Sequence, residues 1–174
     1  AFGDNAMLVS RSANGGVSWG PPKVLRADTD GKVLNDKNSM TADPKLANNV
    51  YAVWDRLVDY TLPSAGGGAT PASLSVTSRT DSVVNARDRY RKFRKSGAAK
   101  RLATPLIFEG PTYFTRTTNG GASWETARNI YDPGPNAQTI NNLTVIRPNG
   151  DVLVFFTDLP ADGSVRIGYV KSTD

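Results

Sequence analysis

The residue types that this chain lacks limit its chemistry from the start. Its 174 residues include no histidine and no cysteine. A Ser-His-Asp or Cys-His nucleophile system and a thiolate or imidazole metal site are therefore excluded. Any catalysis has to use carboxylates, tyrosine, lysine, arginine or hydroxyl groups, and we expect no metal and no cofactor.

Two charged residues that follow an apolar run could contact a ligand. Asp55 and Arg56 come directly after Val-Tyr-Ala-Val-Trp at positions 50–54, a pattern that indicates a buried β-strand. An arginine there could bind a substrate carboxylate through two parallel hydrogen bonds. The alternative is an Asp-Arg pair at a strand end with no part in binding.

An internal repeat indicates which elements position such residues. Positions 12–19 read Ser-Ala-Asn-Gly-Gly-Val-Ser-Trp, and positions 117–124 read Thr-Thr-Asn-Gly-Gly-Ala-Ser-Trp. Each segment lies between strand-like runs, and Asn-Gly tolerates the positive φ values of a tight hairpin turn. We predict two hairpins with the same turn and the start of a third. The repeated residues are Ser12, Asn14, Gly16 and Trp19, then Thr117, Asn119, Gly121 and Trp124, then Ser172 and Asp174.

The spacing of the repeat predicts an all-β chain of four-stranded antiparallel units, as in a β-propeller. The third copy begins 55 residues after the second, which is the length of one blade, but the second begins 105 residues after the first. The extra length predicts an insertion at about 58–110. Apolar residues at helical spacing predict one amphipathic helix in it, near residues 82–95.

Positive charge is concentrated in this insertion. Residues 87–101 carry eight Lys or Arg and one Asp, a net charge of +7, whereas the whole chain carries +5. Such a helix could bind an anionic partner, or it could be a solvated helix whose aromatic residues pack on the sheets. We do not expect nucleic acid to be a partner. No run of 18 apolar residues occurs, so we expect no membrane span.

The repeated turns resemble the Asp boxes, or BNR repeats, of the sialidase superfamily. Residues 35–44, 50–56 and 130–134 are also similar to bacterial exo-α-sialidase-like and BNR-repeat proteins, so the resemblance covers most of the chain outside the insertion. It implies a propeller with six blades when complete, a secreted, extracellular or periplasmic location, and a carbohydrate partner that includes anionic glycans.

The family pattern divides residues 1–174 as a single partial propeller domain. Residues 1–25 end one blade, 26–130 form a blade with the insertion, and 131–174 begin the next. Strands are expected within 6–25 and at 38–42, 50–56, 111–117, 124–130, 139–146, 151–157 and 164–172. Because each blade buries its apolar face on a neighbour, we expect the rest of the propeller or another chain to cover the exposed faces.

The resemblance also implies a catalytic face. Asp36 and Lys37 come just before the expected innermost strand, so Asp36 is the candidate general acid and Lys37 a candidate substrate contact. The alternative for Asp36 is an acceptor that holds local amides at a strand end. Glu109 precedes the strand that carries Tyr113, and a Glu beside a Tyr resembles the sialidase nucleophile pair. Tyr113 could instead belong to the core.

Arg56 and Arg116 are the strand-end arginines that could belong to the family's arginine triad, with Asp55 as a further substrate contact. The family's Phe/Tyr-Arg-Ile-Pro motif is absent from this chain. Two functions therefore stay open. One is a glycoside hydrolase of the exo-α-sialidase type, and the other is a non-catalytic propeller that binds or scaffolds, with the basic insertion as its contact surface.

Overall fold

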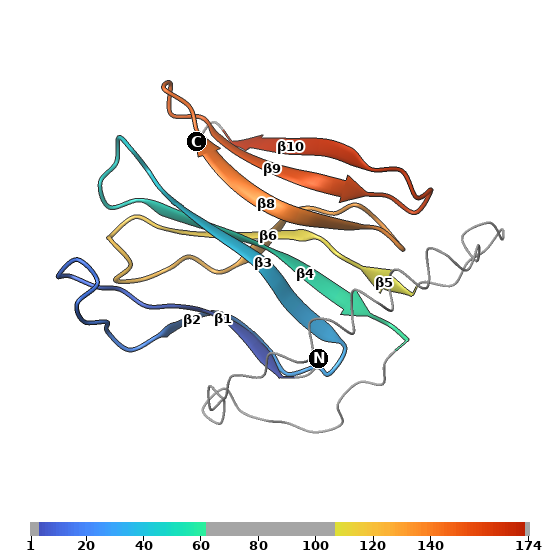
Figure 1. Cartoon of the computed structure of the whole chain (residues 1–174), viewed down its shortest axis with the longest axis horizontal. Helices are drawn as coiled ribbons and strands as arrows, with labels where there is room; N and C mark the ends of the chain where they lie inside the picture. Colours follow the sequence, from blue (N-terminus) through green and yellow to red (C-terminus); the bar gives the residue numbers. More distant parts are fainter. Residues whose placement is uncertain (1–3, 62–106, 173–174) are drawn as a thin grey trace.

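The computed structural model describes residues 4–61 and 107–172, and every regular element in these two ranges is a β-strand (Figure 1). All pairing between strands is antiparallel, so the expected all-β class is confirmed. The helix expected near residues 82–95, the basic segment and Asp174 lie outside the described residues.

The strands form three sheets. The first pairs β1 (Asn5–Val9) with β2 (Lys23–Asp28). The second has the order β3 (Val33–Ala42), β4 (Val50–Asp59), β6 (Thr112–Thr117), β7 (Arg128–Tyr131), with β5 (Phe108–Glu109) beside β4. The third has the order β8 (Gln138–Ile146), β9 (Val152–Leu159), β10 (Arg166–Ser172). Apart from β5 and β6, which both pair with β4, consecutive strands are neighbours in each sheet.

The repeated turns close the β1–β2 and β6–β7 hairpins, and both use the same hydrogen bonds. Asn14 Oδ1 accepts from the Ser18 amide at 2.9 Å, and Asn119 Oδ1 accepts from the Ser123 amide at 2.9 Å. After each tryptophan one main-chain hydrogen bond crosses the hairpin, from the Gly20 amide to Arg11 O and from the Glu125 amide to Arg116 O, both at 2.9 Å. Regular pairing starts later, so β2 and β7 begin about four residues after the starts of the strands expected at 19–25 and 124–130.

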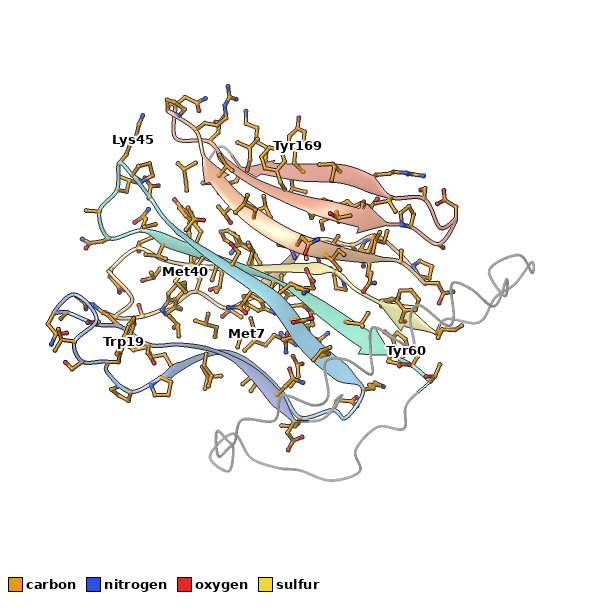
Figure 2. All side chains as sticks on the ribbon, in the orientation of Figure 1. Met7, Trp19, Met40, Lys45, Tyr60 and Tyr169 are labelled. Carbon is orange, nitrogen blue, oxygen red and sulfur yellow. The ribbon has the colours of Figure 1, made fainter. Side chains whose placement is uncertain are left out.

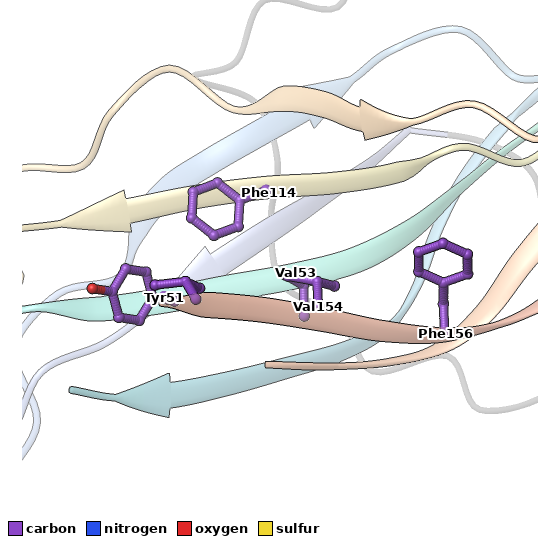
Figure 3. Packing of buried hydrophobic residues seen from close by; sticks show 6 residues of the cluster. Tyr51, Val53, Phe114, Val154 and Phe156 are labelled. Carbon is purple, nitrogen blue, oxygen red and sulfur yellow. The ribbon is translucent and has the colours of Figure 1, made fainter. Parts of the chain in front are cut away.

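The main hydrophobic core lies between the second and third sheets. Tyr51 and Val53 of β4 and Phe114 of β6 pack against Val154 and Phe156 of β9 (Figure 3). These residues alternate along their strands, which is the pattern of a sheet that buries one face. Full burial of each such side chain is worth about 1.5–3 kcal/mol, so this contact holds the two sheets together.

The three sheets lie side by side, and their first strands meet. β3 contacts both β1 and β8, and Thr41 Oγ1 donates to Thr144 O at 3.1 Å between the second and third sheets. Gly110 forms a parallel bridge with Gln138 beside this seam. A Cβ at Gly110 would lie 2.3 Å from Gln138 Cβ, so only glycine allows the two backbones to come this close.

Two equivalent β-bulges interrupt β3 and β8. The pairing of β3 shifts between Asp36 and Ser39, and that of β8 shifts between Ile140 and Leu143. Each bulge contains a residue with positive φ, which is 54° at Lys37 and 60° at Asn141. Asp36 was expected just before its strand, but β3 begins at Val33 and Asp36 lies within it. The bulge explains the difference, because it conceals the continuity of the strand in the sequence pattern.

Candidate functional site

Most of the residues with candidate roles gather at one end of the second sheet, where β3 begins and β4 ends. Asp36 of β3 is paired in register with Asp55 of β4, and Asp55 is paired with Thr112 of β6. Tyr60, just after β4, lies at this end of the molecule in Figure 2. The arrangement places carboxyl, guanidinium and phenol groups near one another.

Asp55 is the most strongly perturbed acid of this cluster. Asp55 is buried, with 4% of the residue exposed. Burial and the nearby negative charge of Asp36 raise the pKa of Asp55 to about 8, although the positive charge of Lys37 acts in the opposite direction. Asp55 is therefore mostly protonated at neutral pH, with Asp36 as its half-buried partner on β3.

The third sheet completes the surroundings of Asp55. The bulge in β8 directs Asn142 across the seam, where Asn142 Nδ2 donates to Asp55 Oδ1. Asn142 Oδ1 lies 3.0 Å from the hydroxyl of Thr112, which is 2.8 Å from that of Thr139. All four side chains belong to buried residues, so the acid is held in a buried polar network.

Asp28 organises a second network beside the first. The Arg56 guanidinium binds its two carboxylate oxygens at 2.6 and 3.1 Å, and Arg26 binds the same two oxygens at 3.1 and 3.0 Å. Asn35 donates to Asp28 at 2.9 Å. Burial alone would raise the pKa of Asp28, but the hydrogen bonds from Arg56, Arg26 and Asn35 hold it well below its usual range. The carboxylate stays ionised and neutralises part of the charge of the arginines.

Tyr113 packs against this network. The Arg26 guanidinium lies 4.9 Å and the Arg56 guanidinium 5.4 Å from the centre of its ring. The ring also contacts Trp54, whose indole N–H donates to Asn35 at 2.8 Å. Tyr113 is thus a platform for two arginines, and its described polar contacts do not include Glu109.

Glu109 pairs with a different tyrosine. The Tyr60 hydroxyl donates to Glu109 Oε2 at 3.0 Å. Burial, followed by the hydrogen bond and charge of Glu109, raises the pKa of Tyr60, so the phenol is protonated at neutral pH. The Lys32 ammonium lies 5.5 Å from the centre of the Tyr60 ring. A tyrosine with a carboxylate as its hydrogen-bond acceptor therefore exists here, with Tyr60 in place of Tyr113.

Arg116 lies apart from the cluster. It is paired in register with Tyr51, four residues along β4 from Asp55, a distance of about 13 Å. Its guanidinium binds Glu125 at 2.6 Å, and Glu125 also binds Arg128 at 3.1 Å. Arg116 supports the β6–β7 hairpin, and it is not brought to the residues around Asp55.

Sequence reasoning missed several residues of the site. Arg26 and Asp28 alternate on β2 and therefore share one face, a spacing that could have singled them out as a pair. Tyr60 could have been linked to Glu109 only through the short pairing of β5 with β4, which joins positions about fifty residues apart. No pattern in the sequence pointed to Asn35, because its role depends on residues of the neighbouring sheet.

No group of three or more potential metal ligands occurs within residues 4–61 and 107–172. In the same ranges no helix is long and apolar enough to cross a membrane. Comparison with protein-family models and with curated proteins found no match for this chain.

Proposed function

We propose that this chain is part of a β-propeller, six-bladed when complete, that acts on extracellular glycans as a sialidase-like glycoside hydrolase. The observation that carries the proposal is the carboxyl pair on β3 and β4. Asp55 is mostly protonated at neutral pH, and Asp36 is its partner in register. Glycosidases commonly use two carboxyl groups of which one holds a proton and the other is ionised.

Each residue takes a role that suits its surroundings. Asp36 is half-buried rather than enclosed, so it is the carboxyl that a glycosidic oxygen reaches. The proton held by Asp55 is passed through Asp36 to that oxygen, which leaves Asp55 ionised until the attacking water returns a proton. Tyr60 and its acceptor Glu109 are a further phenol–carboxylate pair of the proposed site. Tyr60 lies five residues, or about 17 Å, along the chain from Asp55, so the pair is proposed to contact the substrate at the end of the site rather than to attack it. Lys37 and Lys32 provide positive charge for an anionic sugar.

A second function is supported by a specific observation. Arg56, a candidate for binding a substrate carboxylate, already holds Asp28 at two positions. Its charge is therefore partly neutralised. This favours the non-catalytic alternative, in which the propeller binds or scaffolds with the basic insertion as its contact surface and performs no hydrolysis.

Substitution of Asp36 tests the hydrolase. With the complete protein and an oligosaccharide that has a poor leaving group, Asp36→Asn should lower kcat by at least about 100-fold, the lower range for loss of a general acid. An aryl glycoside should be much less affected, because its leaving group needs little protonation. Asp162→Asn, at an exposed carboxylate in the β9–β10 turn, is the matched control and should leave kcat unchanged.

The two functions give different results. Equal loss of kcat on both substrates together with a large fall in melting temperature would assign Asp36 to a structural role. Binding of the glycan without any turnover by the unmodified protein would favour the non-catalytic function. If the unmodified protein neither binds nor hydrolyses the glycan, both functions are contradicted.

A further inference from the structure

A groove lies between the two repeated turns, at the other end of the molecule from the cluster around Asp55. Its volume is about 500 Å³, and its lining includes Arg11, Trp19, Lys23, Gly121, Ala122 and Trp124. Small-molecule sites typically measure about 300–1,000 Å³. Figure 2 shows Trp19 at one end of the molecule and Tyr60 at the other, so the groove is distinct from the site described above.

The two tryptophans of the groove differ although their turns are alike. Trp19 Nε1 donates to Gly16 O at 3.1 Å, which holds the indole against its turn while 65% of the residue stays exposed. Trp124 Nε1 is buried and has no hydrogen-bond partner among the described residues. The groove therefore combines an open aromatic ring with an indole whose donor is unused.

The charged residues of the groove are positive. Arg11 and Lys23 are exposed, and none of the lining residues is Asp or Glu. Lys23 Nζ donates to the main-chain oxygen of Ala122, so it lies over the second turn. Arg11 lies over the same turn, because a Cβ at Gly121 would be 3.9 Å from Arg11 Cδ. Two cations are thus held side by side without a carboxylate partner in the described part of the chain.

We propose that this groove binds an acidic saccharide. The exposed indole of Trp19 offers an apolar surface to the C–H face of a sugar ring, and Arg11 and Lys23 bind the sugar carboxylate. The remaining polar groups are the hydroxyls of Ser10 and Ser18 and neutral peptide groups of the turns, which match sugar hydroxyls. A single-stranded nucleic acid would need a basic groove that follows several phosphates, whereas only two cations line this one.

Indole NMR signals can test this proposal without any measurement of turnover, so the result does not depend on the proposed hydrolase. The protein is labelled with ¹⁵N-tryptophan and titrated with hexagalacturonate and with oligosialic acid. We expect the N–H signals of Trp19 and Trp124 to shift. Trp54 is 0% exposed and its N–H is already bonded to Asn35, so it serves as the internal control. Raising the salt concentration should weaken the binding.

Charge variants make the test specific. Arg11→Gln should weaken binding about tenfold, the scale for one charge-assisted hydrogen bond. Lys45→Gln removes the same charge from an exposed residue of the β3–β4 turn outside the groove, and should change the dissociation constant by less than about twofold. The proposal is overturned if neither acidic oligosaccharide shifts the two signals, if the neutral methyl esters bind as tightly, or if Lys45→Gln weakens binding as much as Arg11→Gln. If a thymidine oligonucleotide binds more tightly than either acidic oligosaccharide, the ligand of the groove is a nucleic acid and the saccharide proposal is wrong.

Discussion

Asp55 links the chemistry of the candidate site to the stability of the protein. Its pKa is raised from 3.8 to about 8 by burial and by Asp36, so the folded chain keeps a proton that the unfolded chain releases. Stability should therefore fall as the pH rises from about 4 to 8 and become level above that range. The loss over this window is on the order of 6 kcal/mol, since each pKa unit corresponds to about 1.4 kcal/mol.

The Asp55→Asn variant isolates this effect. An amide cannot ionise, and its oxygen can still accept the hydrogen bond from Asn142. Urea unfolding between pH 4 and 9 should show the variant gaining stability relative to the unmodified protein as the pH rises. Asp28→Asn is a useful comparison, because the lowered pKa of Asp28 contributes stability above pH 3.8 that is lost in more acidic solution. A constant difference between Asp55→Asn and the unmodified protein across this range would contradict the protonated state.

The repeated turn is an element whose stability comes from one asparagine. Asn119 accepts from the Ser123 amide, donates to the Ser123 hydroxyl at 2.8 Å and accepts from the Thr117 hydroxyl at 2.9 Å. Asn119→Ala should therefore cost about 1–2 kcal/mol in the free energy of unfolding. Asn14→Ala should cost less, because Thr117 is buried whereas Ser12 of the first turn is only half-buried.

Thr118→Ala provides the control for the turn, since Thr118 is exposed and occupies the variable position of the repeat. Its effect should stay within about 0.5 kcal/mol, as for most surface substitutions. Chemical denaturation of the three variants would measure the differences. If Asn119→Ala proves as mild as Thr118→Ala, the side-chain hydrogen bonds do not stabilise the hairpin.

The outer face of the third sheet exposes large apolar side chains. Ile167 and Tyr169 of β10 are 77% and 61% exposed, and they form apolar rows with residues of β9 and β8. The equivalent row of the second sheet includes Phe114, which is 7% exposed because the third sheet covers it. Figure 2 shows Tyr169 at the outer edge of the molecule. A contiguous apolar face of this kind indicates a surface that packs on another layer.

We expect the 174-residue chain to self-associate through this face. The double variant Ile167→Lys, Tyr169→Lys should shift the chain towards monomer in light scattering, with little change in melting temperature, because neither side chain contributes to the buried core. Val17→Lys, at an exposed apolar residue of the first turn, should leave association unchanged. If light scattering shows that the unmodified chain stays monomeric across the concentrations at which proteins usually dimerise, this expectation is wrong.

Local sequence determined the all-β class, the two hairpins and their order, because these depend on alternation along a strand and on turn residues a few positions apart. Asn14 and Asn119 could be recognised from their neighbours alone, since every bond that they make is within four residues. Asp55 and Arg56 were predicted at a strand end because they follow the apolar run 50–54, but β4 continues to Asp59, so both lie within the strand.

The partners of these residues were decided by the tertiary structure. Arg56 meets Asp28 from the first sheet, Asp55 meets Asn142 from the third, and Glu109 meets Tyr60 through the pairing of β5 with β4. Each contact joins segments between 28 and 87 residues apart. Several of these contacts depend on a bulge or on a single close approach of two backbones. Such contacts depend on how sheets pack, and packing is set by the shape and burial of the whole core rather than by any local pattern. For that reason the sequence indicated which residues are candidates for function, and the packing of the three sheets determined their interaction partners.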